Sequence, residues 1–407
     1  MRPDVALISP YPQLGTRHGG ASGVASYTAN LAHALADAGA RPLVVAPHQD
    51  GQPERSQDGP VDVHRAFRIG SANALPEAFA AARASGADVL HLQHELFLYG
   101  GPAATIGLLR ALATERMPTV VTMHQVVDPA VVTADYTRLH RVAVPAPAAR
   151  AGFIALQRAI PRLADTTIVH ERPFTRFVRG ARVVPHGVEP APAAGPEVRA
   201  AARHALELPT DRLVALCFGF VAPYKGLEVA LDAAALAGRD VLLVVAGGEH
   251  PRLAAQGDGY LNELRGRYEG ASGHARFTGF VPDADVAAWF QAADVAVFPY
   301  PEPHASSGAF ALALAHGTPA LVSPRLADAC GVGTDASCPL DPVELAERLR
   351  ALASDPQQRD RMRAATRALA ADRSWHEVAL AHRSIYSDVY EEVERANGSA
   401  RRRLRAA

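Results

Sequence analysis

Short apolar runs alternate with helical stretches along nearly the whole chain, and no other feature restricts the fold as strongly. In the first half, the runs Val5 to Ile8, Val89 to Leu92 and Thr119 to Met123 are separated by stretches with helical periodicity, such as Val24 to Leu35 and Thr105 to Ala113. Runs that are apolar at almost every position predict strands buried on both faces, and helical crossovers predict parallel pairing. The first half is therefore expected to be a doubly wound, Rossmann-like α/β domain.

A second series of the same kind follows a segment rich in Pro, Ala and Gly, Pro190 to Pro196. Its first strand is expected at Leu213 to Phe218 and its last at Ala320 to Val322. A chain of 407 residues is too long for one core. We predict two tandem Rossmann-like domains, 1–190 and 191–375, whose parallel sheets face a central cleft. A C-terminal helix at about 376–395 is expected to cross back to the first domain, and 396–407 to form a basic, disordered tail.

The composition excludes several classes of protein. A formal net charge of −1 gives no bulk field that would attract nucleic acid or an anionic membrane. The 3 cysteines, Cys217, Cys330 and Cys338, lack paired or metal-type spacing, which favours a reducing compartment over a disulfide or zinc framework. No signal-peptide core follows Met1, and no apolar run is long enough to span a bilayer. We therefore expect a cytoplasmic protein with no nucleic-acid partner and no integral membrane segment.

One strand, turn and helix in the second half predict an anion-binding site. The apolar run that starts at Val295 ends in a proline-rich turn, and Ser306, Ser307 and Gly308 then open an alanine- and leucine-rich helix. The free backbone N–H groups at such a helix start, the hydroxyls and the positive end of the helix dipole suit a phosphate group. Lys225 follows the first strand of the same half, and its compact ammonium beside this turn would suit a diphosphate.

In the first half, polar residues collect after the predicted strands. The loop His18 to Gly23 precedes the first helix, and its glycines allow main-chain amides to approach a phosphate or a sugar. Its spacing is not that of a dinucleotide-binding GxGxxG loop, which argues against a nicotinamide enzyme. His91, Gln93 and Glu95 are expected on one face of a strand end and His94 on the other. His124 follows a later strand, where an imidazole can hydrogen-bond a sugar hydroxyl or a developing charge.

Taken together, these segments resemble a known family. The glycine loop, the hinge VVPHGVEP, the loop that ends in Lys225, the strand ADVAVFPY and the segment SSGAFALALAHGTPALVS occur in the order found in retaining glycosyltransferases of family 4, which have the GT-B fold. The resemblance covers nearly the whole chain and is weakest from Gly51 to Leu75 and beyond Glu394. It implies retaining transfer of a sugar from a nucleotide-sugar donor of the GDP, UDP or dTDP type, without a metal ion or another cofactor.

The resemblance also assigns roles to individual residues. It implies that Lys225 neutralises the diphosphate and that His124 lies near the transferred sugar, so these two are the candidate catalytic residues. The residues implied to hold the donor are Ser22, Gly23, Phe280, Val281, His304, Ser306, Ser307, Gly308 and Ala309. The acceptor is expected in the first domain, where the candidate contacts are His18, Gly20, His94, Glu95 and Tyr99.

A small polar acceptor with a hydroxyl or a thiol fits such a set of contacts. The alanine- and arginine-rich composition is typical of GC-rich bacterial genomes, in which natural-product glycosylation is common. Three positions depart from the family pattern: His304 and Leu312 hold the places of two usual glutamates, and Phe220 replaces an arginine that usually precedes the lysine. Members with a Ser-Ser-Gly turn at this place resemble the chain more closely, and the departures leave an unusual donor sugar open.

Two other functions remain open at this point. A non-hydrolysing nucleotide-sugar epimerase shares the fold but needs carboxylates for elimination and readdition, for which Glu95, Asp128 and Glu302 are the candidates. A non-catalytic sugar-binding protein would also close over a ligand. Turnover of the donor without an acceptor would distinguish the epimerase. The nucleobase, the sugar, the linkage and the oligomeric state, including a homodimer, also stay open.

Overall fold

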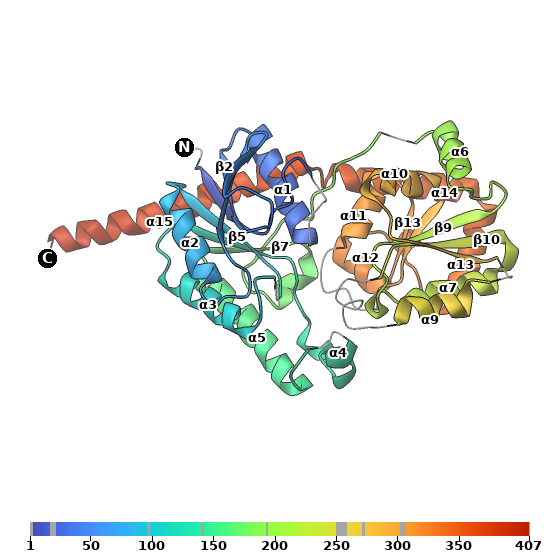
Figure 1. Cartoon of the computed structure of the whole chain (residues 1–407), viewed down its shortest axis with the longest axis horizontal. Coiled ribbons are helices and arrows are strands. Elements are labelled where there is room, and N and C mark those ends of the chain that lie inside the picture. Colours follow the sequence, from blue (N-terminus) through green and yellow to red (C-terminus); the bar gives the residue numbers. More distant parts are fainter. Residues whose placement is uncertain are drawn as a thin grey trace. The chain divides into compact units, whose positions relative to one another are not determined.

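The computed structural model describes residues 3–16, 22–96, 98–139, 142–192, 194–249, 259–270, 273–301 and 307–406. The chain divides into two units (Figure 1). Unit 1 comprises Met1–Gly187 and Trp375–Ala407, and unit 2 comprises Val188–Pro303 and Ser307–Ser374. The division therefore falls at Gly187, slightly before the boundary that the proline-rich segment predicts.

An 8-stranded sheet forms the centre of unit 1, in the order β3-β4-β2-β1-β5-β6-β7-β8. Every neighbouring pair is parallel except β3 with β4. The order reverses between β1 and β5, which creates the switch point at which doubly wound sheets bind ligands. The strands are β1 (Val5–Ile8), β2 (Pro42–Pro47), β3 (Arg55–Asp58), β4 (Val61–Phe67), β5 (Val89–His94), β6 (Thr119–Met123), β7 (Thr166–Val169) and β8 (Arg182–Val183).

The hairpin of β3 and β4 is an element that the apolar runs do not predict. β3 has the sequence RSQD, and β4 alternates buried with more exposed residues along VDVHRAF. Such alternation is typical of an edge with one solvated face, whereas continuous apolar runs identify only strands buried on both faces. The guanidinium of Arg65 is buried in this edge and donates to the carbonyl oxygens of Pro12 and Pro47.

Helices cover both faces of the first sheet. Residues of α1 and α15 pack with Val5 and Leu7 on one face, and residues of α2, α3 and α5 pack with Ala6 and Ile8 on the other. The helices are α1 (Gly23–Asp37), α2 (Ala74–Ala84), α3 (Pro102–Thr114), α4 (Ala134–Leu139), α5 (Ala146–Leu163) and α15 (Trp375–Ala406), with 3-10 turns η1 (Pro129–Val131) and η2 (Arg172–Arg176).

The last helix, α15, is part of unit 1. The ring of Trp375 occupies the space that a side chain at Gly187 would need, and Arg383 donates a hydrogen bond to the carbonyl oxygen of Ala38. The helix continues to Ala406, where the sequence predicts a disordered tail. From Ala400 onward this segment contains only Ala, Arg and one Leu, which are all good helix formers.

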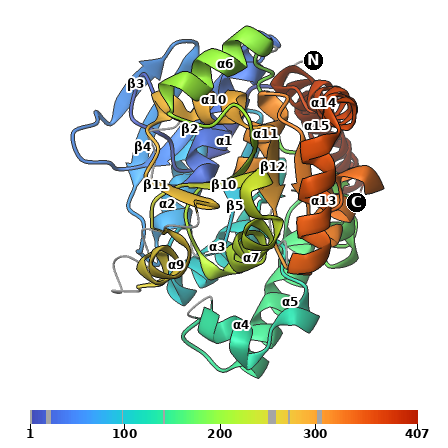
Figure 2. The ribbon, with the colours of Figure 1, turned by 90° about the vertical axis from the view of Figure 1, so that its right-hand side faces the viewer.

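Unit 2 contains a 5-stranded parallel sheet in the order β11-β10-β9-β12-β13, which again reverses beside its first strand. Residues of α7, α9 and α13 pack on one face and those of α6, α10, α11 and α12 on the other. Figure 2 shows α7 beside α13, and α6 beside α10. The strands are β9 (Leu213–Phe218), β10 (Val241–Ala246), β11 (Ala275–Gly279), β12 (Val295–Phe298) and β13 (Ala320–Val322).

The predicted strands Leu213 to Phe218 and Ala320 to Val322 are confirmed with the same bounds. Cys217, Cys330 and Cys338 are all buried. The helices of unit 2 are α6 (Pro196–Ala205), α7 (Leu227–Ala237), α9 (Tyr260–Tyr268), α10 (Asp283–Ala292), α11 (Gly308–Ala315), α12 (Pro324–Cys330), α13 (Pro342–Ser354) and α14 (Pro356–Ala371), with 3-10 turns η3 (Pro223–Lys225), η4 (Gly238–Asp240) and η5 (Thr334–Ala336).

In the described part of the chain, no helix is both long enough and apolar enough to cross a bilayer.

Candidate functional site

Lys225 stands at the end of a short turn that folds back over the carboxyl end of β9. Its ammonium donates to the carbonyl oxygen of Phe218, the last residue of β9, over 3.2 Å. Two glycines make this path possible. Gly219 has φ of +95°, and Gly226 has φ of +63° and no room for a side chain against the carbonyl oxygen of Pro299. The local sequence therefore fixes the lysine at the switch point of the second sheet.

The ammonium of Lys225 is a buried charge without a matching anion. Only 7% of the residue is exposed. Burial lowers the pKa of Lys225 from its usual 10.5 to about 8, and the neighbouring Cys217 raises it slightly. Among the described residues, the carbonyl oxygen of Phe218 is its hydrogen-bond partner, and no carboxylate pairs with it. Because an unpaired buried cation is costly, this position favours an anionic ligand.

The start of α11 lies beside Lys225. Both the Nζ atom of Lys225 and the Cβ atom of Ala309 lie within 4 Å of the point where a Cβ on Gly219 would stand. Ser307 is the N-cap of α11, and its hydroxyl accepts a hydrogen bond from the Phe310 amide over 3.1 Å. The position of a Cβ on Gly308 is open space, so its backbone is accessible. The ammonium and the positive end of α11 thus converge, because β9 and β12 are neighbouring strands.

Two residues that the sequence predicts to contact the nucleotide-sugar donor, Phe280 and Val281, follow β11. Phe280 is 70% exposed, while Val281 is buried in the core beside Trp289. A Cβ on Gly248 would lie 3.3 Å from the Cβ of Phe280, so the loop after β10 passes close to the phenylalanine. An exposed aromatic ring next to a bare backbone can stack on a flat ligand group such as a nucleobase.

In the first half, Ser22 is the N-cap of α1, and its hydroxyl accepts from the Ala25 amide over 3.3 Å. Gly23 is the first residue of the helix, and the space around it is open. This end of α1 can therefore receive an anion or a polar group. His18, Gly20, His304 and Ser306 lie outside the described residues.

His124 belongs to a buried chain of hydrogen bonds in unit 1. Its Nε2 lies 2.8 Å from Oε1 of Gln93, and its Nδ1 lies 3.0 Å from Nε2 of His170. The Nδ1 of His170 donates to the carbonyl oxygen of Val184 over 2.9 Å. Burial, followed by the charges that His170 and other nearby histidines would carry, holds the pKa of His124 well below its usual value. The ring is therefore neutral at pH 7.

The neutral state fixes the protons along this chain. Because the carbonyl oxygen of Val184 only accepts, a neutral His170 carries its proton on Nδ1 and accepts at Nε2. His124 must then donate from Nδ1, which leaves its Nε2 as an acceptor. This nitrogen therefore needs a donor, and Gln93 supplies one when its side-chain amide places its nitrogen toward His124 and its oxygen toward His91. As predicted, Gln93 and His91 share one face of β5, since the side-chain amide group of Gln93 lies 3.1 Å from Nε2 of His91.

The acceptor candidates His94, Glu95 and Tyr99 line one small cavity of about 30 Å³, which holds no more than a water molecule. The hydroxyl of Tyr99 is buried, where it contacts the carbonyl oxygens of Gln93 and Ile8 at 2.7 and 3.0 Å. That bonding ties β5 to β1 and does not support a contact between Tyr99 and an acceptor. Burial lowers the pKa of His94 to about 4, and its Nδ1 has no hydrogen-bond partner. Glu95 is half-buried.

Sequence reasoning misses the aromatic surroundings of His124. The ring of Tyr27 lies edge-on to His124 with centroids 4.6 Å apart, and it also contacts His170, His186 and Trp375. A signal for His170 is present in the sequence, because it directly follows β7, the neighbour of β6. No local pattern indicates that a residue as remote as Trp375 joins this group.

Comparisons with family models match both halves of the chain. Residues 21–191 match the model described as Glycosyltransferase Family 4, and residues 212–355 match the model described as Glycosyl transferases group 1. Two curated relatives are D-inositol 3-phosphate glycosyltransferases. The one from Streptosporangium roseum is 33% identical over 205 residues, and the one from Streptomyces griseus is 34% identical over 209. The matches cover 47% and 48% of this chain, and 46% and 43% of the relatives, so the chain spans less than half of their length.

Solved structures of other proteins superpose on nearly the whole chain. Sucrose-phosphate synthase from Thermosynechococcus elongatus superposes with a TM-score of 0.72 at 20% identity, and the match covers 96% of this chain and 100% of that one. The Anabaena protein HepE in complex with UDP gives a TM-score of 0.66 at 17% identity, covering 95% and 100%.

The two Rossmann-like units and the superposed structures define a protein of the GT-B fold. Within that class, both halves are similar to glycosyltransferases, the first half to those of family 4. In the described residues, no group of three or more His, Cys, Asp or Glu side chains is arranged to hold a metal ion.

Proposed function

We propose that the chain is a retaining glycosyltransferase that moves a sugar from a nucleotide-diphosphate sugar to a small polar acceptor without a metal ion. Unit 2 binds the donor and unit 1 the acceptor. The observation that carries the proposal is the buried ammonium of Lys225 beside the start of α11. The family matches support it, as do three structures of HepE in complex with UDP, with UDP and glucose, and with UDP-glucose.

In the proposed reaction, Lys225 stabilises the leaving group. The bond between the anomeric carbon and the donor diphosphate breaks, and the acceptor oxygen or sulfur forms its bond to the same face of that carbon. The acceptor proton passes to an oxygen of the departing diphosphate, so no protein base is needed. Charge accumulates on this diphosphate, where the ammonium and the backbone amides of α11 offset it. Residues 218–226 contain no other cation, because Phe220 stands where an arginine is usual.

The neutral ring of His124 would orient the transferred sugar. With Nδ1 donating to His170, its Nε2 accepts a hydrogen bond. A sugar hydroxyl can replace Gln93 as the donor to this nitrogen. On α11, the half-buried Leu312 lies against the core of unit 2, so no carboxylate from that position reaches a ribose. We infer that the ribose is held by other groups and that the donor sugar is one of less common type.

The acceptor is a small soluble molecule with a hydroxyl or a thiol. Two relatives carry the name D-inositol 3-phosphate glycosyltransferase, which favours a polyol such as a cyclitol or another sugar. The composition, typical of GC-rich bacteria, suggests a role in specialised metabolism.

The first test is a thermal-shift screen of the full chain with UDP, GDP and dTDP, since a bound product stabilises the folded state without knowledge of the acceptor. We expect one nucleotide to raise the melting temperature and Lys225→Met to lose that response. The matching sugar nucleotides are then incubated with candidate acceptors, and the anomeric configuration of the product is read by NMR. No response to any nucleotide diphosphate would overturn the proposal, and conversion of the donor without an acceptor would identify an epimerase.

A further inference from the structure

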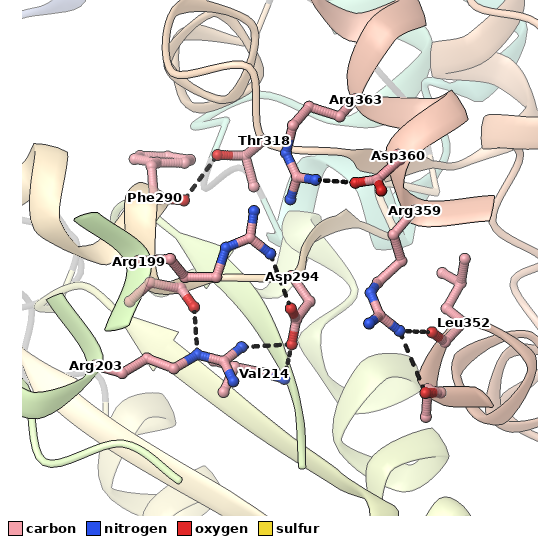
Figure 3. Close-up of polar contacts among 12 residues, drawn as sticks. Arg199, Arg203, Val214, Phe290, Asp294, Thr318, Leu352, Arg359, Asp360 and Arg363 are labelled. Atoms are coloured by element: carbon pink, nitrogen blue, oxygen red, sulfur yellow. Dashed lines mark hydrogen bonds and ion pairs between the residues drawn. The ribbon is translucent and has the colours of Figure 1, made fainter. Parts of the chain in front are cut away.

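A second concentration of positive charge lies in unit 2, in a hollow of about 520 Å³ lined by α6 and α14. Five of its lining side chains are arginines, Arg199, Arg203, Arg359, Arg363 and Arg367, and we call this hollow the arginine pocket. Figure 3 shows Arg199, Arg203 and Asp294 on one side of this region and Arg359, Asp360 and Arg363 on the other.

The spacing of the arginines places them on single faces of their helices. Arg199 and Arg203 are four residues apart on α6, and Arg359, Arg363 and Arg367 follow at four-residue intervals on α14. Faces that two helices turn toward a common space normally carry apolar side chains that fill it. Here the faces carry guanidinium groups, so the hollow remains open.

Part of this charge is neutralised within the fold. Asp294, which is buried, accepts hydrogen bonds from Arg199 at 3.2 Å, from Arg203 at 2.5 Å and from the Val214 amide at 2.9 Å. Arg203 also donates to the carbonyl oxygen of Ala292. Arg359 donates to the carbonyl oxygens of Leu352 and Ala353 at the end of α13. Through these contacts, Arg203 and Arg359 stabilise the fold of unit 2.

Arg363 and Arg367 are not explained in this way. The side chain of Arg363 is only 12% exposed, and its partner at 2.8 Å is Asp360, whose side chain is 75% exposed. An exposed partner of this kind contributes little stability. Arg367 has no hydrogen bond or ion pair within the part of the chain that the structure describes, and its stem lies against Gly317. Within the described residues, these five guanidinium groups thus pair with two carboxylates, Asp294 and Asp360.

The excess charge has an electrostatic consequence. Burial lowers the pKa of Arg363 to about 10, with Arg199 and Arg367 lowering it further and Asp360 raising it. The arginines therefore repel one another in the free protein, and a dianion placed among them would relieve this repulsion. The start of α6 lies at the same hollow, where Gly195 is an N-cap without a side-chain hydrogen bond, so free amides add to the positive potential.

We propose that the arginine pocket binds a small molecule that carries a phosphoryl dianion, either inorganic phosphate or a phosphate ester. Guanidinium groups match the oxygens of a phosphate in pairs, which a single lysine does not. The volume exceeds that of phosphate alone and leaves room for an ester group such as a hexose.

This pocket is separate from the proposed donor site. Asp294 directly precedes β12, and Val214 lies near the start of β9, so the arginines stand at the amino ends of these strands. Lys225 and Ser307 follow the carboxyl ends of the same two strands. The two anion sites therefore occupy opposite edges of one sheet, and the second does not depend on the proposed function.

The test measures melting temperature of the full chain in phosphate, in glucose 6-phosphate and in sodium chloride at matched ionic strength. We expect a saturable rise of about 3 °C or more with the phosphates over chloride. Arg363→Gln should lose this rise while its melting temperature without phosphate stays equal or increases, because the variant removes a repelled charge. Arg361→Gln is the matched control, since Arg361 is on the same helix but is 68% exposed and does not line the pocket.

The phosphate response of further variants, and the affinities for two ligands, test the proposal. Lys225→Met should keep the full phosphate response, which separates the pocket from the donor site. A response equal to that in chloride, or one that Arg363→Gln and Arg367→Gln both retain, would overturn the proposal; the second variant serves if the first does not fold. Equal affinity for phosphate and glucose 6-phosphate identifies the free ion as the ligand, and tighter binding of glucose 6-phosphate identifies an ester.

Discussion

The ammonium nitrogen of Lys225 lies 2.8 Å from the point where a Cβ atom on Gly219 would stand. The lysine therefore depends on the missing side chain of a residue that precedes it in the same loop. Gly219 also has φ of +95°, which side-chain-bearing residues rarely adopt. One glycine thus serves two purposes, since it turns the chain after β9 and leaves the volume that the charged group occupies.

Replacing Gly219 by alanine is expected to displace Lys225 and to weaken binding of the nucleotide diphosphate about tenfold or more. The positive φ should also cost about 1–3 kcal/mol of stability. Calorimetric titration measures the first effect and urea unfolding the second. Gly238→Ala is the matched control, because Gly238 has φ of +73° but open space around its Cβ position. If both variants bind the nucleotide as the wild type does, the proposed fit between Gly219 and Lys225 is wrong.

Donor binding is expected to weaken as the pH rises through about 8. The pKa of Lys225 is about 8 in the free protein, and a bound diphosphate raises it because the anion favours the charged form. Binding near pH 8 and above is therefore coupled to proton uptake, and the dissociation constant increases by up to tenfold per pH unit. Titrations in two buffers with different ionisation enthalpies measure this uptake. Lys225→Met should bind the nucleotide weakly and without proton uptake. Proton uptake that persists in this variant would come from another group.

Sequence alone predicts the parts of the site that depend on topology. Lys225 and the Ser307 turn lie far apart along the chain, but each follows a fully apolar strand, and those strands, β9 and β12, are neighbours in a sheet that reverses its order there. The carboxyl ends of neighbouring parallel strands meet at one edge, so their loops must be close. For this reason a pattern of apolar runs is sufficient to bring the two segments together.

The rest depends on side-chain packing that no local pattern records. Tyr99 occupies a loop after β5 where a ligand contact is a reasonable expectation, but its hydroxyl contacts the backbone carbonyls of Gln93 and Ile8. Trp375 joins the group around His124 through the ring of Tyr27, because α15 and α1 pack on the same face of the first sheet. Apolar runs do not predict β3, which is polar, or β4, in which buried and more exposed residues alternate.

His170 is expected to act on catalysis through His124. Replacing His170 by leucine removes the acceptor of the Nδ1 proton of His124, so that this proton is lost from its fixed position or left unpaired. We expect kcat to fall about tenfold to a hundredfold with KM nearly unchanged. In His170→Gln, the amide oxygen can take nearly the position of the removed Nε2 atom and accept the same hydrogen bond. This variant should therefore recover most of kcat.

The comparison of the two variants separates positioning from stability. If His170 only supports the fold, both variants lose melting temperature, but the folded fraction of each keeps the wild-type kcat. Normal kcat in folded His170→Leu would contradict the positioning role. Circular dichroism at the assay temperature gives the folded fraction.

Unit 1 is expected to lose stability as the pH falls below about 6.5. His94 and His382 are buried, and burial lowers the pKa of each to about 4, with a hydrogen bond to Val378 partly offsetting the effect at His382. Between pH 6.5 and 4 the unfolded chain binds protons that the folded chain does not, so stability decreases as the pH is lowered. Each of the two groups accounts for about 3 kcal/mol over this range.

The chain contains 2 tryptophans, which allows this effect to be assigned to unit 1. Trp375 is buried in unit 1 and Trp289 in unit 2, so Trp289→Phe leaves a reporter of unit 1 alone. Urea midpoints measured by its fluorescence at pH 7 and pH 5 should differ clearly. His382→Leu should reduce that difference, because it removes a group whose Nε2 also lacks a hydrogen-bond partner. Replacing the exposed His204 should leave the difference between the midpoints unchanged. If His382→Leu shows the full pH effect, the other buried histidines cause that effect.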